Sequence, residues 1–232
     1  MKVLGIDTST SCGSVGLVED NRIISDYLLN TPVTHSERLL KAIDLILQES
    51  RCSMSDLDGW AISLGPGSFT GLRIGASTVK GLSFATGKPV MGVPTLDVLA
   101  FQVSPTPYLI RPILDARKGE VYTASYRYEE KDLIKQKSPY QAIKPGDLVK
   151  RIEEKTIFIG EGAKTYGDFL KESLGNFTTF VFPSLNVPHG STVAKLGLEL
   201  LCQKKILDLA TFSPIYVRPS EAEIKWREKH PD

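Results

Sequence analysis

The chain has 232 residues, of which 28 are Lys or Arg and 27 are Asp or Glu, so its formal net charge is +1. This balance argues against a protein that holds nucleic acid by itself through phosphate neutralisation. No apolar run reaches the ~20 residues that a membrane span requires. The cysteines, Cys12, Cys52 and Cys202, are odd in number and far apart, which is typical of a reducing compartment. We therefore expect a cytoplasmic protein without membrane contact.

The first half of the chain predicts an antiparallel meander followed by alternating helices and strands. The expected elements are strands at 2–6, 14–18, 22–28, 60–64 and 89–93 and helices at 35–50, 73–86 and 95–103. The helix at 35–50 is the strongest of these predictions, because its apolar side chains gather in one broad arc. The arc consists of Leu39, Leu40, Ala42, Ile43, Ile46 and Leu47. Its breadth indicates more than one surface against which the helix packs.

The second half repeats this layout, with a hairpin followed by helices and strands. The expected elements are strands at 109–114, 120–127 and 156–159 and helices at 145–154, 165–174 and 191–204. Such a repeat predicts two related α/β lobes. We place the first lobe at residues 1–104 and the second at 105–232, the second range leaving room for part of the last helix of the first lobe.

A glycine-rich loop joins the strand at 60–64 to the helix that follows. The sequence from Leu64 to Gly75 reads LGPGSFTGLRIG. Such a loop can turn backbone N–H groups toward an anion at a helix N-terminus, or it can let the helix lie close to its neighbours. It matches neither the GxxxxGK[ST] nor the GxGxxG pattern, which argues against nucleotide sites of those two kinds.

Small residues recur at four-residue intervals along this helix. They are Gly71 and Gly75, and then Ser77, Gly81 and Ala85. Such rows leave shallow grooves into which another helix can pack closely. The neighbour is either the chain's own sheet and its helix at 35–50, or another subunit.

Asp7 ends the first strand, and Asp115 holds the corresponding place in the second half. Asp7 is followed by three hydroxyl side chains, those of Thr8, Ser9 and Thr10. Two acids that face one cleft would suit a nucleotide with Mg²⁺, the hydroxyls binding its phosphates. Equally, these groups can satisfy the backbone of a turn, and the cations after Asp115 can neutralise it. No HExxH or HxxxH pair occurs in the sequence, so we predict no metal site.

Six stretches carry a wider resemblance. They are GIDTST at 5–10, HSERLL at 35–40, GPGSFTGLRIG at 65–75, PTLD at 94–97, DARKGEVY at 115–122 and GEGA at 160–163. Together they resemble the bacterial TsaB (YeaZ) family. The resemblance extends over nearly the full length and is weakest after Pro214.

The resemblance implies two lobes of the actin-like, sugar-kinase and Hsp70-like ATPase fold, in agreement with the repeat. It also implies a non-catalytic scaffold for the paralogue TsaD, which transfers the threonylcarbamoyl group to tRNAs that read codons beginning with A. TsaE would join the same complex, tRNA would be engaged indirectly, and a homodimer would form without TsaD. The chain itself would require no cofactor.

The catalytic paralogue carries an HxxxH metal motif after the strand that follows the glycine-loop helix. Alignment on residues 89–93 places Thr95 and Leu99 at the two histidine positions, and neither side chain is a plausible transition-metal ligand. The resemblance therefore implies that this chain is not itself an enzyme. The alternative is a nucleotide-hydrolysing or phosphoryl-transferring enzyme of the same fold, in which Asp7 and Asp115 act on ATP or ADP with Mg²⁺.

By position, the family's surface for TsaD lies on the helices at 35–50 and 71–86. A second copy of the chain would bury the same apolar area, which is why a homodimer is expected from the same surface. The residues that we assign to partner contact are Leu39, Leu40, Ile43, Ile46, Leu47, Gly71, Leu72, Gly75, Thr78 and Gly81.

Overall fold

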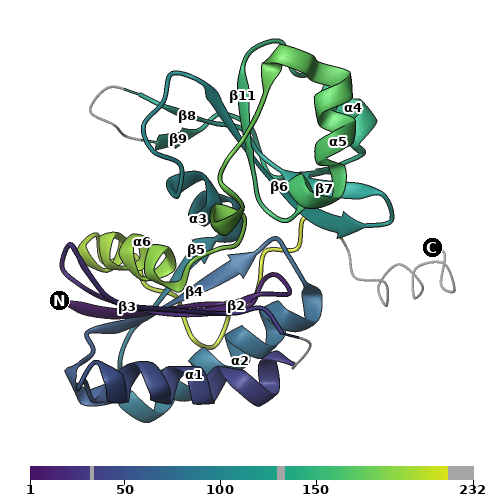
Figure 1. Ribbon diagram of the computed structural model, residues 1–232. Coiled ribbons are helices and arrows are strands. Elements are labelled where there is room, and N and C mark those ends of the chain that lie inside the picture. Colours follow the sequence, from purple (N-terminus) through teal and green to yellow (C-terminus); the bar gives the residue numbers. More distant parts are fainter. Residues whose placement is uncertain (32–33, 130–133, 219–232) are drawn as a thin grey trace, which may run out of the picture.

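The computed structural model describes residues 1–31, 34–129 and 134–218, and these form two lobes that are each built on a β-sheet (Figure 1). The strands of the first sheet are β1 (Lys2–Asp7), β2 (Gly13–Glu19), β3 (Arg22–Leu29), β4 (Gly59–Gly65) and β5 (Val90–Pro94). They lie in the order β3-β2-β1-β4-β5. β1 pairs antiparallel with β2 and parallel with β4, so the predicted meander and the βα unit after it are both confirmed.

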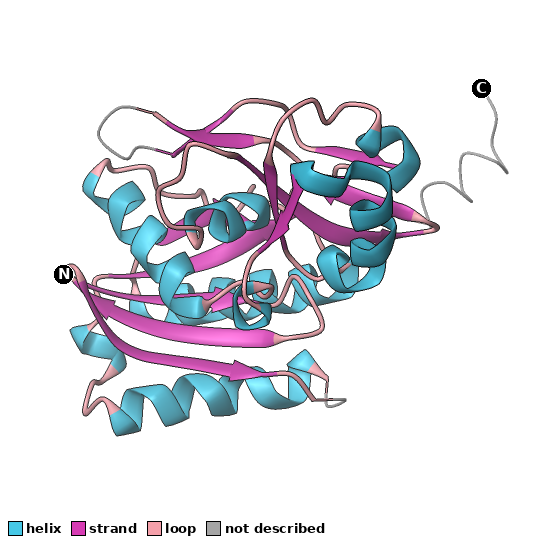
Figure 2. Cartoon of the chain, turned by 45° about the horizontal axis from the view of Figure 1, so that its top comes forward, coloured by secondary structure: helices cyan, strands magenta, loops and turns pink. Residues whose placement is uncertain are grey.

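Helices cover both faces of this sheet (Figure 2). α1 (His35–Glu49) and α2 (Phe69–Thr86) lie on one face, and α6 (Gly190–Cys202) lies on the other. The buried arc of α1 packs with Val79 of α2 and with Leu4 and Ile6 of β1 in one apolar cluster. α2 begins four residues before the predicted start, because Ser68 Oγ accepts a hydrogen bond from the Gly71 N–H group (3.3 Å) and caps the helix there.

The chain returns to the first lobe after it has built the second. α6 packs on β1, β2 and β4, and a Cβ on Gly5 would lie 2.3 Å from the Gly190 carbonyl oxygen. Beyond α6, the Leu207 N–H group donates to the Val90 carbonyl (2.8 Å), and Ile215 donates to Leu64 (2.7 Å). Residues 190–215 therefore belong to the first lobe, where the sequence analysis placed at most part of one helix. The end of the expected second lobe, 219–232, lies outside the described residues.

The second lobe contains a mixed sheet. Its strands are β6 (Leu109–Arg117), β7 (Glu120–Thr123), β8 (Tyr126–Tyr128), β9 (Ile134–Gln136), β10 (Gln141–Ile143), β11 (Thr156–Ile159) and β12 (Thr178–Phe180). The main path runs β10-β7-β6-β11-β12, and β8 joins β6 to β9. The single strand predicted at 120–127 is wrong, because the chain leaves β10 at residue 123 and pairs with Ile110 and then with β9.

Two helices, α4 (Pro145–Val149) and α5 (Gly162–Leu174), lie beside the second sheet (Figure 1). α4 ends five residues before the prediction, because the chain turns there and enters β11 at Thr156. Short 3₁₀ turns are η1 (Met54–Asp56), η3 (Gly175–Phe177) and η4 (Pro183–Leu185). Within the described ranges, no helix combines the length and the apolar character needed to cross a bilayer.

α3 (Thr95–Phe101) lies where the two lobes meet and contacts β4, β6 and α6. Its Asp97 Oδ1 accepts hydrogen bonds from the hydroxyls of Tyr126 (2.6 Å) and Tyr140 (2.7 Å). Burial raises the pKa of Asp97 against the opposing effect of these two bonds. α3 is thereby fixed to the second lobe.

Candidate functional site: an interlobe cleft and a helix face

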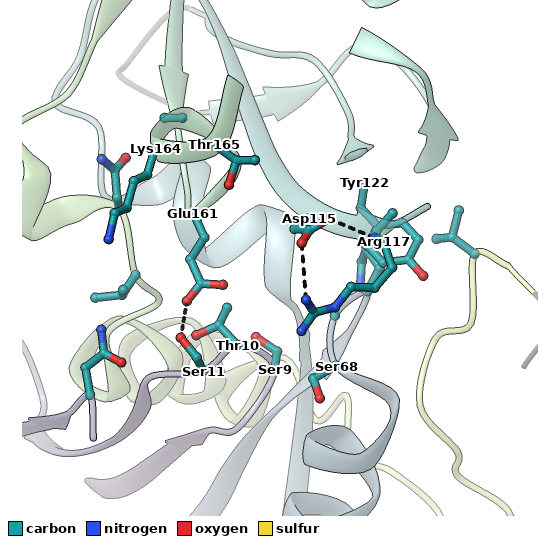
Figure 3. A pocket seen from close by; sticks show the side chains of 18 of the residues that line it. Ser9, Thr10, Ser11, Ser68, Asp115, Arg117, Tyr122, Glu161, Lys164 and Thr165 are labelled. Atoms are coloured by element: carbon teal, nitrogen blue, oxygen red, sulfur yellow. Dashed lines mark hydrogen bonds and ion pairs between the residues drawn. The ribbon is translucent and has the colours of Figure 1, made fainter. Parts of the chain in front are cut away.

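A cleft with a volume of about 1130 Å³ lies between the lobes (Figure 3). The first lobe supplies its wall from the β1–β2 loop and the glycine loop, and the second lobe supplies the β6–β7 turn and the start of α5. The segment that follows α6 also reaches the cleft. The polar side chains that line it include Ser9, Thr10, Ser11, Ser68, Asp115, Arg117, Glu161, Lys164, Lys171 and Arg218.

The polar groups of the β1–β2 loop form hydrogen bonds within the first lobe. The Thr8 hydroxyl donates to the Gly71 carbonyl (2.8 Å). The Ser9 hydroxyl and N–H group both donate to the Asp7 carboxylate (2.9 and 3.0 Å), and the Ser68 N–H group donates to the Ser9 carbonyl (2.6 Å). Thr10 Oγ1 donates to a carbonyl of the same loop (3.1 Å). The groups predicted to bind phosphate therefore hold the loop against α2.

Asp7 is 0% exposed and does not line the cleft. Burial raises the pKa of its carboxyl to about 6. Asp115 does line the cleft. A site that uses both acids would need them at one cleft, but only Asp115 lines it, because the loop after β1 folds over Asp7.

The β6–β7 turn is open by contrast. Asp115 accepts a hydrogen bond from the Arg117 N–H group (2.8 Å) and forms an ion pair with its guanidinium (3.6 Å), as Figure 3 shows. Arg117 and Lys118 both have positive φ (63° and 53°), a conformation uncommon outside glycine. The Asp115 carboxylate is therefore paired within its own turn, which is the simpler of the two roles considered for it.

One hydrogen bond crosses the cleft directly. Ser11 Oγ in the β1–β2 loop donates to Glu161 Oε1 at the start of α5 (2.8 Å), and Figure 3 shows the two side chains facing each other. Gly160 before it has φ of 112°, and a Cβ there would lie 2.4 Å from the Ile113 carbonyl oxygen. The GEG sequence is therefore a tight strand-to-helix turn that brings an acid to the opposite lobe.

A segment that the sequence analysis missed closes one side of the cleft. Tyr216 stacks on Phe69 at the start of α2, with ring centroids 4.6 Å apart. The guanidinium of Arg73 lies 4.0 Å from the Phe69 ring centroid. Two residues later, Arg218 donates to Glu120 Oε2 of β7 (3.0 Å). The alternating sequence IYVR at 215–218 was the available signal, but it lies where the resemblance is weakest.

The structure divides the predicted partner residues into buried and exposed sets. The buried set faces this chain's own interior and consists of Leu39, Ile43, Ile46, Leu47, Gly71, Leu72 and Gly75. A Cβ on Gly71 would lie 2.0 Å from the Thr8 carbonyl oxygen, and one on Gly75 would lie 2.3 Å from Thr8 Oγ1. The apolar arc and the first two glycines therefore pack within the lobe, which is the alternative that the spacing left open.

Three of the predicted partner residues reach the surface. Leu40 is 57% exposed, Gly81 is exposed with open space around its Cα, and Thr78 is half-buried. Leu45 and Phe84, which were not predicted, lie on the same two helices, and Phe84 is 88% exposed. Leu45 was detectable in the sequence as the apolar residue outside the arc of its helix. The accessible part of α1 and α2 is therefore defined here by Leu40, Leu45, Thr78, Gly81 and Phe84.

The two positions aligned with the HxxxH motif lie in α3, and both are 0% exposed. Leu99 packs in the apolar cluster that contains Leu96, Ile110 and Ile159. Thr95 Oγ1 has no hydrogen-bond partner in the described part of the chain. Across that same part, no three His, Cys, Asp or Glu side chains gather as metal ligands.

Known proteins are similar to this chain over nearly its full length. A family model described as TsaD, tRNA N6-adenosine threonylcarbamoyltransferase, matches residues 31–226. The tRNA threonylcarbamoyladenosine biosynthesis protein TsaB of Bacillus subtilis (strain 168) is 32% identical over 231 residues, which cover 98% of this chain and 99% of the relative. The chain belongs to the TsaB (YeaZ) family. The match to a TsaD model is in keeping with a paralogue of TsaD.

Solved structures agree with this family and with the fold. A Pseudomonas aeruginosa protein described as similar to the peptidase YeaZ has a TM-score of 0.79 at 26% identity, covering 94% of this chain and 99% of its own. The ROK hexokinase of Thermus thermophilus has a TM-score of 0.50 at 12% identity over 88% of this chain and 100% of its own, which shows the fold alone. The predicted two-lobed fold of the actin-like and sugar-kinase type is confirmed.

Proposed function

We propose that this chain is a non-catalytic partner of TsaD in the threonylcarbamoyladenosine modification of tRNAs that read codons beginning with A. The observation that supports a non-catalytic role is the packing of Leu99 in the core. At the place where the resemblance puts a metal-binding histidine of TsaD, this chain has a leucine in the apolar cluster beneath the second lobe. A position used for the core cannot supply a ligand without rebuilding α3.

The contact with TsaD is assigned to the accessible part of α1 and α2. An exposed phenylalanine on a helix surface is a typical interface anchor, because its burial removes a large apolar area from water. Phe84 has this position, and the open space around Gly81 lets another helix approach. The same surface would form the homodimer in the absence of TsaD. TsaE would then join the complex elsewhere, and tRNA would be engaged through TsaD.

Reconstitution of threonylcarbamoyl transfer tests the function itself. TsaD, TsaE and the enzyme that supplies the threonylcarbamoyl donor are incubated with an unmodified tRNA, with and without this chain. We expect modification of the tRNA only when the chain is present, and we expect none from the chain without TsaD. Full modification in its absence would refute the proposal.

Substitutions of exposed residues test the surface without disturbing the core. Phe84→Asp and Leu40→Asp should each abolish co-purification with TsaD, because a carboxylate would be buried in an apolar contact. Phe182→Asp is the matched control, since Phe182 is also strongly exposed (78%) but lies on the second lobe. Far-UV circular dichroism checks that all three variants are folded. Binding to TsaD at wild-type affinity by both helix variants would remove this surface from consideration.

A nucleotide in the cleft is the second candidate, and the cations there favour it. Arg117, Lys164 and Lys171 line a cavity of suitable size for an adenine nucleotide, about 1130 Å³. Calorimetry with ATP or ADP and Mg²⁺ tests this candidate. Binding that falls in Lys164→Met but not in Asp7→Asn would support a nucleotide ligand held by the second lobe. Turnover that depends on Asp7 would instead support the enzyme, and no heat of binding would reject both.

A further inference from the structure

Arg111 in β6 is a buried cation without a partner. Its side chain is 6% exposed, and neither a hydrogen bond nor an ion pair joins it to another residue in the described part of the chain. Its Nε atom is fully covered and lacks an acceptor. A buried guanidinium is costly unless an anion or several acceptors satisfy it. The unpaired charge of Arg111 therefore lowers the stability of the fold, and binding of an anion there would offset this loss.

The sheet sets three further polar side chains beside Arg111. Residues alternate between the two faces of a strand, so Arg111 shares the face of Ile113, which packs against α4 and α5. Thr123 pairs with Ile113 across the β6–β7 ladder, and Gln141 pairs with Thr123 across the next ladder. Arg151, just after α4, donates to Gln141 Oε1 (3.0 Å).

Thr123, like Arg111, is a buried polar residue with an unsatisfied side-chain atom. Its hydroxyl is buried, and Oγ1 has no partner among the described residues. Diagonal neighbours on adjacent antiparallel strands lie roughly 7–8 Å apart, which long side chains span easily. Two unsatisfied buried polar groups therefore lie on one face of two neighbouring strands, β6 and β7, and Arg151 lies at the surface after α4. None of the four residues lines the interlobe cleft.

The charge that acts on Arg111 is the positive one of Arg151, whereas Asp147 of α4, which pairs with Lys150, lies within the field of Arg151 alone. Burial lowers the pKa of Arg111 to about 10, and the positive charge of Arg151 acts in the same direction. Within the described ranges, no carboxylate forms an ion pair with either arginine. Two guanidinium groups, a hydroxyl and an amide together suit a tetrahedral oxyanion better than a cation or an apolar ligand.

We infer that Arg111 and Arg151, with the Thr123 hydroxyl between them, form a phosphate-binding site on the α4 side of the second lobe. The phosphate is either a free one or a phosphodiester of an RNA backbone. Only the RNA source rests on the proposed function, because it needs a tRNA in the complex. The site itself would stand if the role beside TsaD were refuted.

Calorimetry with inorganic phosphate at constant ionic strength, set with chloride, tests the site on the full chain. Arg111→Met and Arg151→Met should each weaken phosphate binding at least tenfold. Arg22→Met is the matched control, since it removes one arginine from an exposed position in the first lobe and should leave the binding unchanged. Arg151 is exposed, so its variant keeps the test valid if Arg111→Met does not fold. Equal phosphate binding by wild type and Arg151→Met would overturn the proposal.

A thermal scan without phosphate separates a binding role from a structural one. If the role of Arg111 is to bind an anion, then Arg111→Met removes a buried unpaired charge, and Tm should rise by about 2–4 °C. If the guanidinium serves the fold, Tm should fall, and this result would count against the site. Arg151→Met should leave Tm unchanged.

A second measurement identifies the source of the phosphate. The complex with TsaD is titrated with an unmodified tRNA at several salt concentrations. A phosphodiester source predicts weaker binding by both arginine variants and a salt slope that is smaller by about one for each. If phosphate binding is lost while tRNA affinity stays unchanged, a free phosphate group is the ligand, and the site is retained.

Discussion

The two lobes present the same kind of loop to the cleft and use it in opposite ways. After β1, the loop folds under the start of α2, and Asp7 with its hydroxyl neighbours becomes buried. After β6, the turn stays at the surface, where the side chain of Asp115 is only partly covered and that of Arg117 is exposed. Sequence position alone would make the two acids equivalent.

The difference lies in the helix that follows each loop. α2 begins with glycines whose Cα atoms lie against the Thr8 backbone and hydroxyl, so the helix lies directly on the loop. α5 begins beside Ile113 instead and leaves the β6–β7 turn free, although its Glu161 reaches across to Ser11. The β1–β2 loop of the first lobe thus supports the helix that we assign to partner contact.

The largest effect is expected where α2 lies on the loop. Gly71→Ala would place a Cβ 2.0 Å from the Thr8 carbonyl oxygen, and neither backbone can move without breaking the Thr8–Gly71 hydrogen bond. We expect a loss of about 3 kcal/mol or more in the free energy of unfolding, measured by urea denaturation. Gly81→Ala is the control, because nothing lies within 4 Å of the new Cβ. It should stabilise the helix by up to ~1 kcal/mol. Equal stability of the two variants would contradict the close contact.

Burial of Asp7 predicts an unusual dependence of stability on pH. Its folded pKa is raised from 3.8 to about 6, so between these values the folded chain binds a proton that the unfolded chain has lost. Stability should therefore fall as pH rises through this window, by on the order of 3 kcal/mol. Asp7→Asn should remove this fall and be the more stable protein at pH 7. Urea denaturation of both proteins from pH 3.5 to 8 checks the result, and parallel curves would mean that Asp7 is not buried.

The helix that returns to the first lobe has its own titrating contact. His189 Nδ1 lies 2.7 Å from Asp26 Oδ2 of β3, and this hydrogen bond is the main cause that raises the pKa of His189 above 6.5. The stabilisation should be complete below pH 6.5 and lost as pH rises through the raised pKa. Its size is about 1.5 kcal/mol, typical of a hydrogen bond to a charged group. Asp26→Asn should abolish this loss, which lies at higher pH than the effect of Asp7. A wild type without any slope between pH 6.5 and 8.5 would contradict the contact.

Much of the fold follows from patterns in single segments. The arc of α1 and the apolar run of β4 are local, and both elements form near the expected residues. The misplaced elements depend on distant partners. The strand predicted at 120–127 is divided because β8 pairs with β9, and the return of α6 to the first lobe depends on close contact with Gly5 and Gly16. The residues of α6 alone do not indicate that this helix packs against Gly5 and Gly16.

The site was predicted less well for the same reason. The four-residue spacing identified Gly71, Gly75 and Gly81 as places where another part of the structure can approach closely. Two of the three are such places, but the spacing does not indicate which element lies against them. The first two face Thr8, whereas the space around Gly81 is open. An apolar position of a helix also gives no sign of whether the core or a partner covers it. Leu39 and Leu40 are adjacent and alike, and only the structure shows that the first is buried and the second exposed.

The smallest predicted effect belongs to the hydrogen bond that joins the two compared regions. Ser11 Oγ and Glu161 Oε1 are 2.8 Å apart at an exposed place, so the bond should contribute only about 0.5–1 kcal/mol. A double-mutant cycle with Ser11→Ala and Glu161→Gln isolates this coupling from the effect of each substitution alone. Because the bond connects the lobes, its loss should also widen the cleft, which small-angle scattering measures as a larger radius of gyration. No coupling and no expansion would mean that α3 and the segment at 215–218 hold the lobes together without it.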